Sequence, residues 1–142
     1  MNIKKNTGLK DFEINIKIEL ASLWTATTFC YLYGDYFELY TPGKVGSLIS
    51  GENVLNSPMI LFIASLILTI PPLMIFLSLI LKPHINKVLN IIIGLLFTIM
   101  MILVAIGSLT LWYSFYVFLA IVEAILTFII VWKAFKWPKQ TD

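Results

Sequence analysis

Residues 17–40, KIELASLWTATTFCYLYGDYFELY, form a long apolar stretch that carries polar side chains at helical spacing. In an α-helix, residues three and four apart lie on the same face. The polar face of this stretch would present Trp24, Thr25, Thr28, Tyr31, Asp35 and Glu38. The pattern predicts a membrane-inserted helix that turns this face toward the rest of the protein and away from lipid.

The composition of the whole chain also indicates a membrane protein. Hydrophobic residues make up 59% of the 142 residues and charged residues 13%, whereas soluble domains are usually about 45–50% apolar and about 25% charged. Three further apolar runs follow the first. We predict an all-α fold, a single membrane domain over residues 1–142, with spans at about 18–40, 58–81, 88–109 and 113–135. As helices of ~22–24 residues, they would be ~33–36 Å long and could cross a ~30 Å hydrocarbon core.

Helix-breaking signals separate the four runs. The first run ends at TPG, residues 41–43, and a loop over residues 41–57 is expected to follow. Ser57 before Pro58 is a typical helix start, and KPH at 82–84 is expected to stop the second span. Two of the connections are short, which favours antiparallel neighbours and an up-down-up-down four-helix bundle.

The lysines predict how the bundle is oriented. All ten basic residues are Lys and none is Arg. With the N-terminus in the cytoplasm, nine lysines lie on the cytoplasmic side: Lys4, Lys5, Lys10, Lys17, Lys82, Lys87, Lys133, Lys136 and Lys139. The positive-inside rule therefore predicts that both termini are cytoplasmic. The net charge of +2 is too small to indicate a nucleic-acid partner.

Small and polar side chains predict which helix faces meet, because lipid gives no hydrophobic drive for helices to associate. The expected contact residues are Ala64, Ser65, Leu68, Pro72 and Ser78 in the second span, Gly94, Thr98, Met101, Ala105 and Ser108 in the third, and Tyr116, Ala120, Glu123, Ala124 and Thr127 in the fourth.

Three of the carboxylates within the predicted spans, Glu123, Asp35 and Glu38, are the candidate functional groups. Glu123 lies ten residues, or ~15 Å, into the fourth span, near the bilayer midplane. A charged carboxylate there costs at least ~2.5–3.5 kcal/mol, so Glu123 should face protein or water. Asp35 and Glu38, about one turn apart, predict a polar vestibule or cap at the outer end of the first span. Together with Tyr31, Thr28 and Trp24, these acids form the predicted ligand or proton site.

Pro71 and Pro72 lie near the middle of the second span. Each proline lacks a backbone N–H and crowds the carbonyl four residues earlier, so a kink is expected. This kink is either a hinge or a fixed bend.

No other residues suggest chemistry. His84 is the single histidine and Cys30 the single cysteine, so no metal site is expected. The sequence contains no nucleotide-binding, hydrolase or metalloprotease motif. No catalytic residue, cofactor or enzymatic activity is predicted.

Several motifs carry a family resemblance: Leu23-Trp24, YLYGD at 31–35, YTPG at 40–43, Glu123, and VWKAFKWP at 131–138. With these motifs, residues from about 14 to 138 resemble a family of small, four-span bacterial membrane proteins known only as a domain of unknown function. The resemblance implies a four-span fold in a bacterial cytoplasmic membrane. It implies no activity, substrate or cofactor.

Two functions fit these observations. In the first, the protein is a transporter or permeation subunit in which Glu123 and Asp35 bind a proton or cation in a cavity beside the kinked second span, as a homodimer. In the second, it is a non-catalytic membrane interaction or assembly module, and Glu123 is a structural, hydrogen-bonded acid. The only partner that both functions require is the lipid bilayer.

Overall fold

The computed structural model describes residues 12–138, and every regular element in that range is a helix. In chain order the elements are α1 (Ile16–Glu38), α2 (Lys44–Ser50), α3 (Pro58–Ile80), α4 (Pro83–Gly107), the short 3-10 helix η1 (Leu111–Tyr113) and α5 (Ser114–Phe135). The predicted all-α class is confirmed for these residues. Lys4, Lys5, Lys10 and Lys139, which contributed to the predicted orientation, lie outside them.

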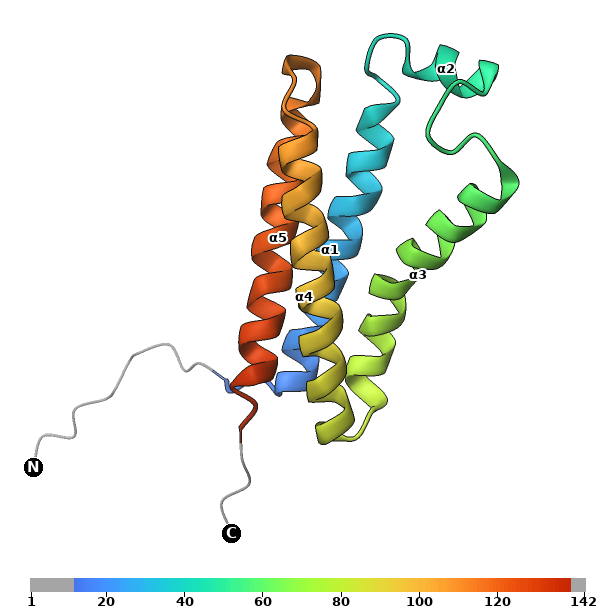
Figure 1. Ribbon diagram of the computed structural model, residues 1–142. Helices are drawn as coiled ribbons and strands as arrows, with labels where there is room; N and C mark the ends of the chain where they lie inside the picture. The colour runs from blue at the N-terminus through green and yellow to red at the C-terminus, as the bar shows by residue number, and fades with distance from the viewer. Residues whose placement is uncertain (1–11, 139–142) are drawn as a thin grey trace, which may run out of the picture.

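The four long helices alternate in direction, and α3 leans away from the other three toward its start (Figure 1). α4 packs along α5, α1 packs against both α5 and α3, and α3 contacts α4 much less. We call the end of the bundle that carries α2 the α2 end. The opposite end, where α1 begins and α5 ends, is the terminal end (Figure 1).

Within the described residues, three helical segments are long and apolar enough to cross a membrane: Pro58–Ile80, Pro83–Gly107 and Leu111–Phe135. They support the assignment as a membrane protein. α1 has 23 residues but is more polar, with a Lys and a Glu near its start and an Asp and a Glu near its end. The four-span topology and the cytoplasmic placement of the termini therefore stay predictions.

Two predicted boundaries were wrong. The second span does end before residues 82–84 as expected, since α3 ends at Ile80, but the next helix, α4, begins at Pro83, five residues before the predicted 88. Proline suits a first helical position, because its φ is already helical and its missing N–H would have no partner there. The expected loop at 41–57 contains α2, which is bracketed by Gly43 and Gly51 at φ 81° and 76°. These left-handed angles favour glycine.

The predicted contact face of α3 is only partly correct. Ser78 is buried as expected, but Leu68 and Pro72 are exposed. α3 buries Pro71, Met74 and Ser78 instead, all in its second half. The first half of α3 leans away from α1, so it has no helix to pack against (Figure 1). The helix continues through both prolines, and the hinge stays a prediction.

The predicted contact faces of α4 and α5 are also partly correct. Gly94, Met101, Ala120, Glu123 and Thr127 are buried as expected. The two helices also bury residues outside the predicted faces: Asn86, Asn90, Phe97, Ile130 and Ala134. A Cβ added to Gly94 would lie 2.7 Å from Val131 Cγ2 and 3.4 Å from the Thr127 carbonyl oxygen. Glycine at this position therefore allows α4 and α5 to approach closely.

Candidate functional site

A small cavity, which we call the carboxylate cavity, lies between α1, α4 and α5. Its volume is about 30 Å³, and it is lined by Tyr31, Gly34, Asp35, Met101, Val104, Tyr116, Leu119, Ala120 and Glu123. A buried water needs roughly 10–15 Å³ of such space and two to four polar partners. The carboxylate cavity is therefore large enough for a water molecule or a small ion, and too small for an organic substrate.

Glu123 enters this cavity from α5. The residue is only 4% exposed, so the structure places it in the interior, as predicted. Its backbone carbonyl accepts a hydrogen bond of 2.8 Å from the Thr127 hydroxyl. Within residues 12–138, its carboxylate makes no hydrogen bond or ion pair with any side chain. A buried carboxylate in this state is available to bind a proton, a water or a small cation.

Tyr31 lies opposite, on α1. Its hydroxyl is buried and has no hydrogen-bond partner among the described residues. Leaving such a group unsatisfied costs about 1–3 kcal/mol. Tyr31 and Glu123 therefore give the same small space a hydroxyl that can donate and a carboxylate that can accept.

Asp35, one helical turn after Tyr31, lines the cavity too. Unlike Glu123 it is exposed, and it lies nearer the α2 end. The structure thus brings together two of the three predicted acids. The expected position beside the kinked second span was wrong, because α3 contributes no residue to the lining.

Glu38, the third predicted acid, is not a cavity residue. Its carboxylate forms a 2.6 Å ion pair with Lys44 Nζ of α2 and accepts a 3.2 Å hydrogen bond from the Tyr113 hydroxyl. Of the two predicted alternatives, a vestibule or a cap, Glu38 forms the cap: an ion-paired contact that ties α2 and η1 to α1.

Trp24 and Thr28 also lie away from the cavity. The Thr28 hydroxyl donates to the Trp24 carbonyl within α1. The Trp24 indole N–H donates to Asn90 Oδ1 at 2.7 Å, and both residues are fully buried. Asn90 Nδ2 donates to Asn86 Oδ1 at 2.7 Å, and Asn86 Nδ2 donates to the Ser78 carbonyl at 2.6 Å. This asparagine cluster joins α1, α3 and α4.

Neither asparagine was among the predicted helix-contact or site residues. Two amides four residues apart at the start of an otherwise apolar run were the available signal. Side chains that can hydrogen-bond between helices typically mark helix contacts in membranes.

Phe97 separates the carboxylate cavity from the asparagine cluster. Its ring, 4% exposed, meets the Trp24 ring edge-on at 6.1 Å between centroids and the Tyr31 ring at 6.0 Å. The interior therefore holds two polar clusters with an aromatic side chain between them.

Within the described range, no three His, Cys, Asp or Glu side chains come together in a way that could hold a metal ion. No curated protein and no solved structure matches the chain. A family described as "Family of unknown function (DUF6326)" matches residues 9–142. This match covers nearly the whole chain, so the protein belongs to the DUF6326 family of unknown function.

Proposed function

We propose that this protein is a four-span membrane protein of the bacterial cytoplasmic membrane, with both termini in the cytoplasm, and that it acts in proton-linked transport or permeation. Glu123 and Asp35 form its proton-binding site. The observation that carries this proposal is the buried Glu123 carboxylate, which has no partner in residues 12–138 and borders a water-sized cavity. An ionisable group inside a membrane protein is a functional candidate by default.

The size and lining of the cavity support a proton as the ligand. About 30 Å³ leaves room for a water but not for an organic molecule. The nine lining residues include two carboxyls and no basic side chain. Ionising both carboxyls would place two negative charges in one small site, which is costly away from bulk water. A proton held on one of them, with the Tyr31 hydroxyl close by, removes that cost.

The burial pattern supports access from the α2 end. Asp35 is exposed and lies nearer that end, whereas Glu123 is buried. On the other side of Tyr31, Phe97 and Trp24 close the interior with ring contacts. A proton would therefore reach Glu123 past Asp35, and onward passage would require Phe97 to move.

Glu123→Gln tests the proposal. The protein is reconstituted into liposomes that contain a pH-sensitive dye, and proton uptake is recorded after a pH jump. The wild type is expected to show uptake above protein-free liposomes, and Glu123→Gln should abolish that increment. Glu52→Gln, a change in an exposed connection, is the matched control and should behave as the wild type. Infrared difference spectra should show a carboxyl band that titrates with pH and is lost in Glu123→Gln.

An unchanged titrating band and unchanged uptake in folded Glu123→Gln would overturn the proton site. Circular dichroism and gel filtration establish that the variant is folded. Asp35→Asn should slow uptake without removing the Glu123 band, because Asp35 supplies access and not the buried site.

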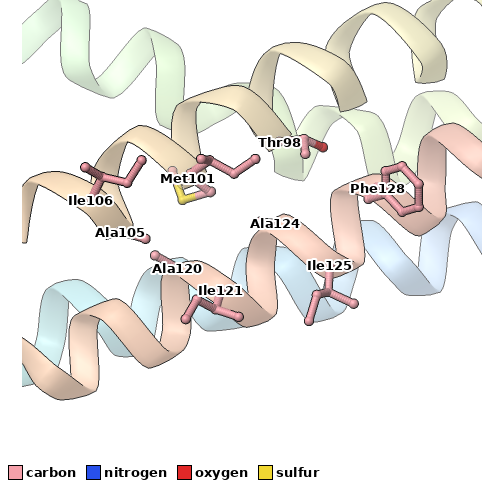
Figure 2. Close-up of a pocket in the computed structure, with 10 residues that line it drawn as sticks. Thr98, Met101, Ala105, Ile106, Ala120, Ile121, Ala124, Ile125 and Phe128 are labelled. Carbon is pink, nitrogen blue, oxygen red and sulfur yellow. The ribbon is translucent and has the colours of Figure 1, made fainter.

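A groove on the outer surface of α4 and α5 supports the homodimer predicted for the transporter, and it also favours the second candidate function, a non-catalytic assembly module. Figure 2 shows the side chains that border it. The groove has a volume of about 370 Å³ and is lined by Thr98, Met101, Ile102, Ala105, Ile106, Ala120, Ile121, Ala124, Ile125 and Phe128. Its alanines would let another helix approach closely.

Ala124→Leu would fill part of this groove. If the assembly function is correct, this change should convert a dimer into a monomer in single-molecule photobleaching, and Glu123→Gln should leave the dimer intact. A wild-type protein that is monomeric at every density tested would exclude the dimer.

A further inference from the structure

A separate hollow lies at the terminal end, between the start of α1 and the end of α5. We call it the terminal hollow. Its volume is about 320 Å³, and it is lined by Ile14, Ile16, Glu19, Trp132, Lys133, Lys136 and Pro138. It shares no residue with the carboxylate cavity. We propose that the terminal hollow binds the phosphate group of an anionic phospholipid.

The charges in the hollow favour an anion. Lys133 and Lys136 are three residues apart and lie on neighbouring positions of the helix surface. Lys133 Nζ lies 3.0 Å from Glu19 Oε2. Lys136 Nζ lies 4.1 Å from the centroid of the Trp132 ring and, among residues 12–138, is within salt-bridge distance of no carboxylate. The lining therefore holds two ammonium groups and one carboxylate, which gives it a net charge of +1.

The position of the hollow favours a lipid over a free anion. The apolar segment Leu111–Phe135 ends one residue before Lys136, which places the ammonium group at the level expected for headgroups. Trp132 is half exposed beside it, and tryptophan is enriched at membrane–water interfaces. Ile14 and Ile16 add apolar surface that lipid tails can cover. Basic pockets between helices at the membrane surface are known to bind anionic headgroups.

Other lysines at the terminal end are engaged differently. Lys17 Nζ donates to the Leu81 carbonyl at 2.7 Å, and Lys87 Nζ donates to the Phe135 carbonyl at 3.0 Å. Both amines bind carbonyls at the C-terminal ends of helices, where cations are stabilising. Lys82 is exposed just before α4 and lines no part of the hollow. Lys82 therefore provides a matched control for a specific site.

Native mass spectrometry of the purified full-length protein tests the proposal. The protein is incubated with phosphatidylglycerol or with phosphatidylcholine of the same acyl chains, and the retained lipid is counted. The wild type should retain phosphatidylglycerol preferentially. Lys136→Gln should weaken that retention roughly fivefold, as expected for one lysine near the surface. Lys82→Gln should leave it unchanged, and Glu19→Gln should strengthen it because Lys133 is freed.

Three outcomes would overturn the site. Equal losses in Lys82→Gln and Lys136→Gln would show that diffuse surface charge attracts the lipid. Equal retention of the two lipids by the wild type would show that the negative charge of phosphatidylglycerol does not contribute to binding. Displacement of phosphatidylglycerol by millimolar inorganic phosphate would show a free-anion site in place of a lipid site. Lys136 is exposed, so folding of the variant is expected and is checked by circular dichroism.

Discussion

Replacing Asn90 with leucine should lower the free energy of unfolding more than any single polar-to-apolar change on the protein surface. Asn90 is fully buried and makes three short hydrogen bonds: one from the Trp24 indole N–H at 2.7 Å, one to Asn86 Oδ1 at 2.7 Å and one to the Asn86 carbonyl at 2.9 Å. Leucine has a similar branched shape but is larger, and it can neither donate nor accept. The change therefore removes the bonds and leaves no cavity in their place.

The expected size of this effect follows from the bonds that are lost. Hydrogen bonds between membrane helices contribute on average ~0.6 kcal/mol and at most ~1.7 kcal/mol each. Two groups, the Trp24 N–H and Asn86 Oδ1, would also remain buried without a partner, at about 1–3 kcal/mol each in water-based measurements. We expect the free energy of unfolding to fall by about 2–4 kcal/mol.

Reversible unfolding in mixed micelles of increasing SDS fraction, followed by circular dichroism, measures this change. Ser65→Ala is the control, because Ser65 is exposed and its hydroxyl bonds only to its own helix, at the Phe62 carbonyl. A double-mutant cycle with Trp24→Phe isolates one bond, and the coupling should be about 1 kcal/mol. A loss below 0.5 kcal/mol for Asn90→Leu, with no coupling to Trp24, would refute the reasoning that the asparagine cluster holds α1, α3 and α4 together.

Three further changes test other parts of the structure. Gly94→Ala should lower the free energy of unfolding by about 1–3 kcal/mol in the same assay, because the added Cβ would meet Val131. Gly107→Ala, with open space around it, should not lower this free energy. Equal effects of the two changes would contradict the close approach of α4 and α5. Glu38→Gln should speed hydrogen exchange in α2 but change the free energy of global unfolding by less than ~1 kcal/mol, because the ion pair with Lys44 is partly exposed. Unchanged exchange would show that this ion pair does not hold α2 against α1. Tyr31→Phe removes a hydroxyl that has no partner among the described residues, so the free energy of unfolding should change by less than ~1 kcal/mol. The infrared carboxyl band of Glu123 should shift. An unshifted band would show that the Tyr31 hydroxyl does not interact with Glu123.

The sequence was most informative where one local property decides the outcome. Apolar runs of sufficient length predicted three helices that the structure contains, because only a helix satisfies its own backbone within lipid. The cost of a charge in lipid likewise predicted that Glu123 faces the interior.

The sequence was misleading where a residue is compatible with two different local structures or sites. Proline both follows helix ends and begins helices, and Pro83 does both: α3 ends at Ile80, and α4 begins at Pro83 itself. The sequence analysis used only the first role and therefore placed the start of this helix too late. The polar face of α1 looked like one site, yet Trp24 and Asp35 belong to different clusters. The two residues share a face of α1 but lie about three helical turns, or ~16 Å, apart along it.

By itself, then, the chain determined that it is helical, that it is apolar enough for a membrane, and that one deep carboxylate must avoid lipid, since each of these depends on length, hydropathy and the cost of burying charge. Only the tertiary structure decided which helices meet. It placed Glu123, Asp35 and Tyr31 around one water-sized space, kept α3 out of it, and put Phe97 between that space and Asn90. Such contacts depend on how helices from distant parts of the chain pack. The periodicity of one helix shows which face is buried but does not identify the helix that covers it.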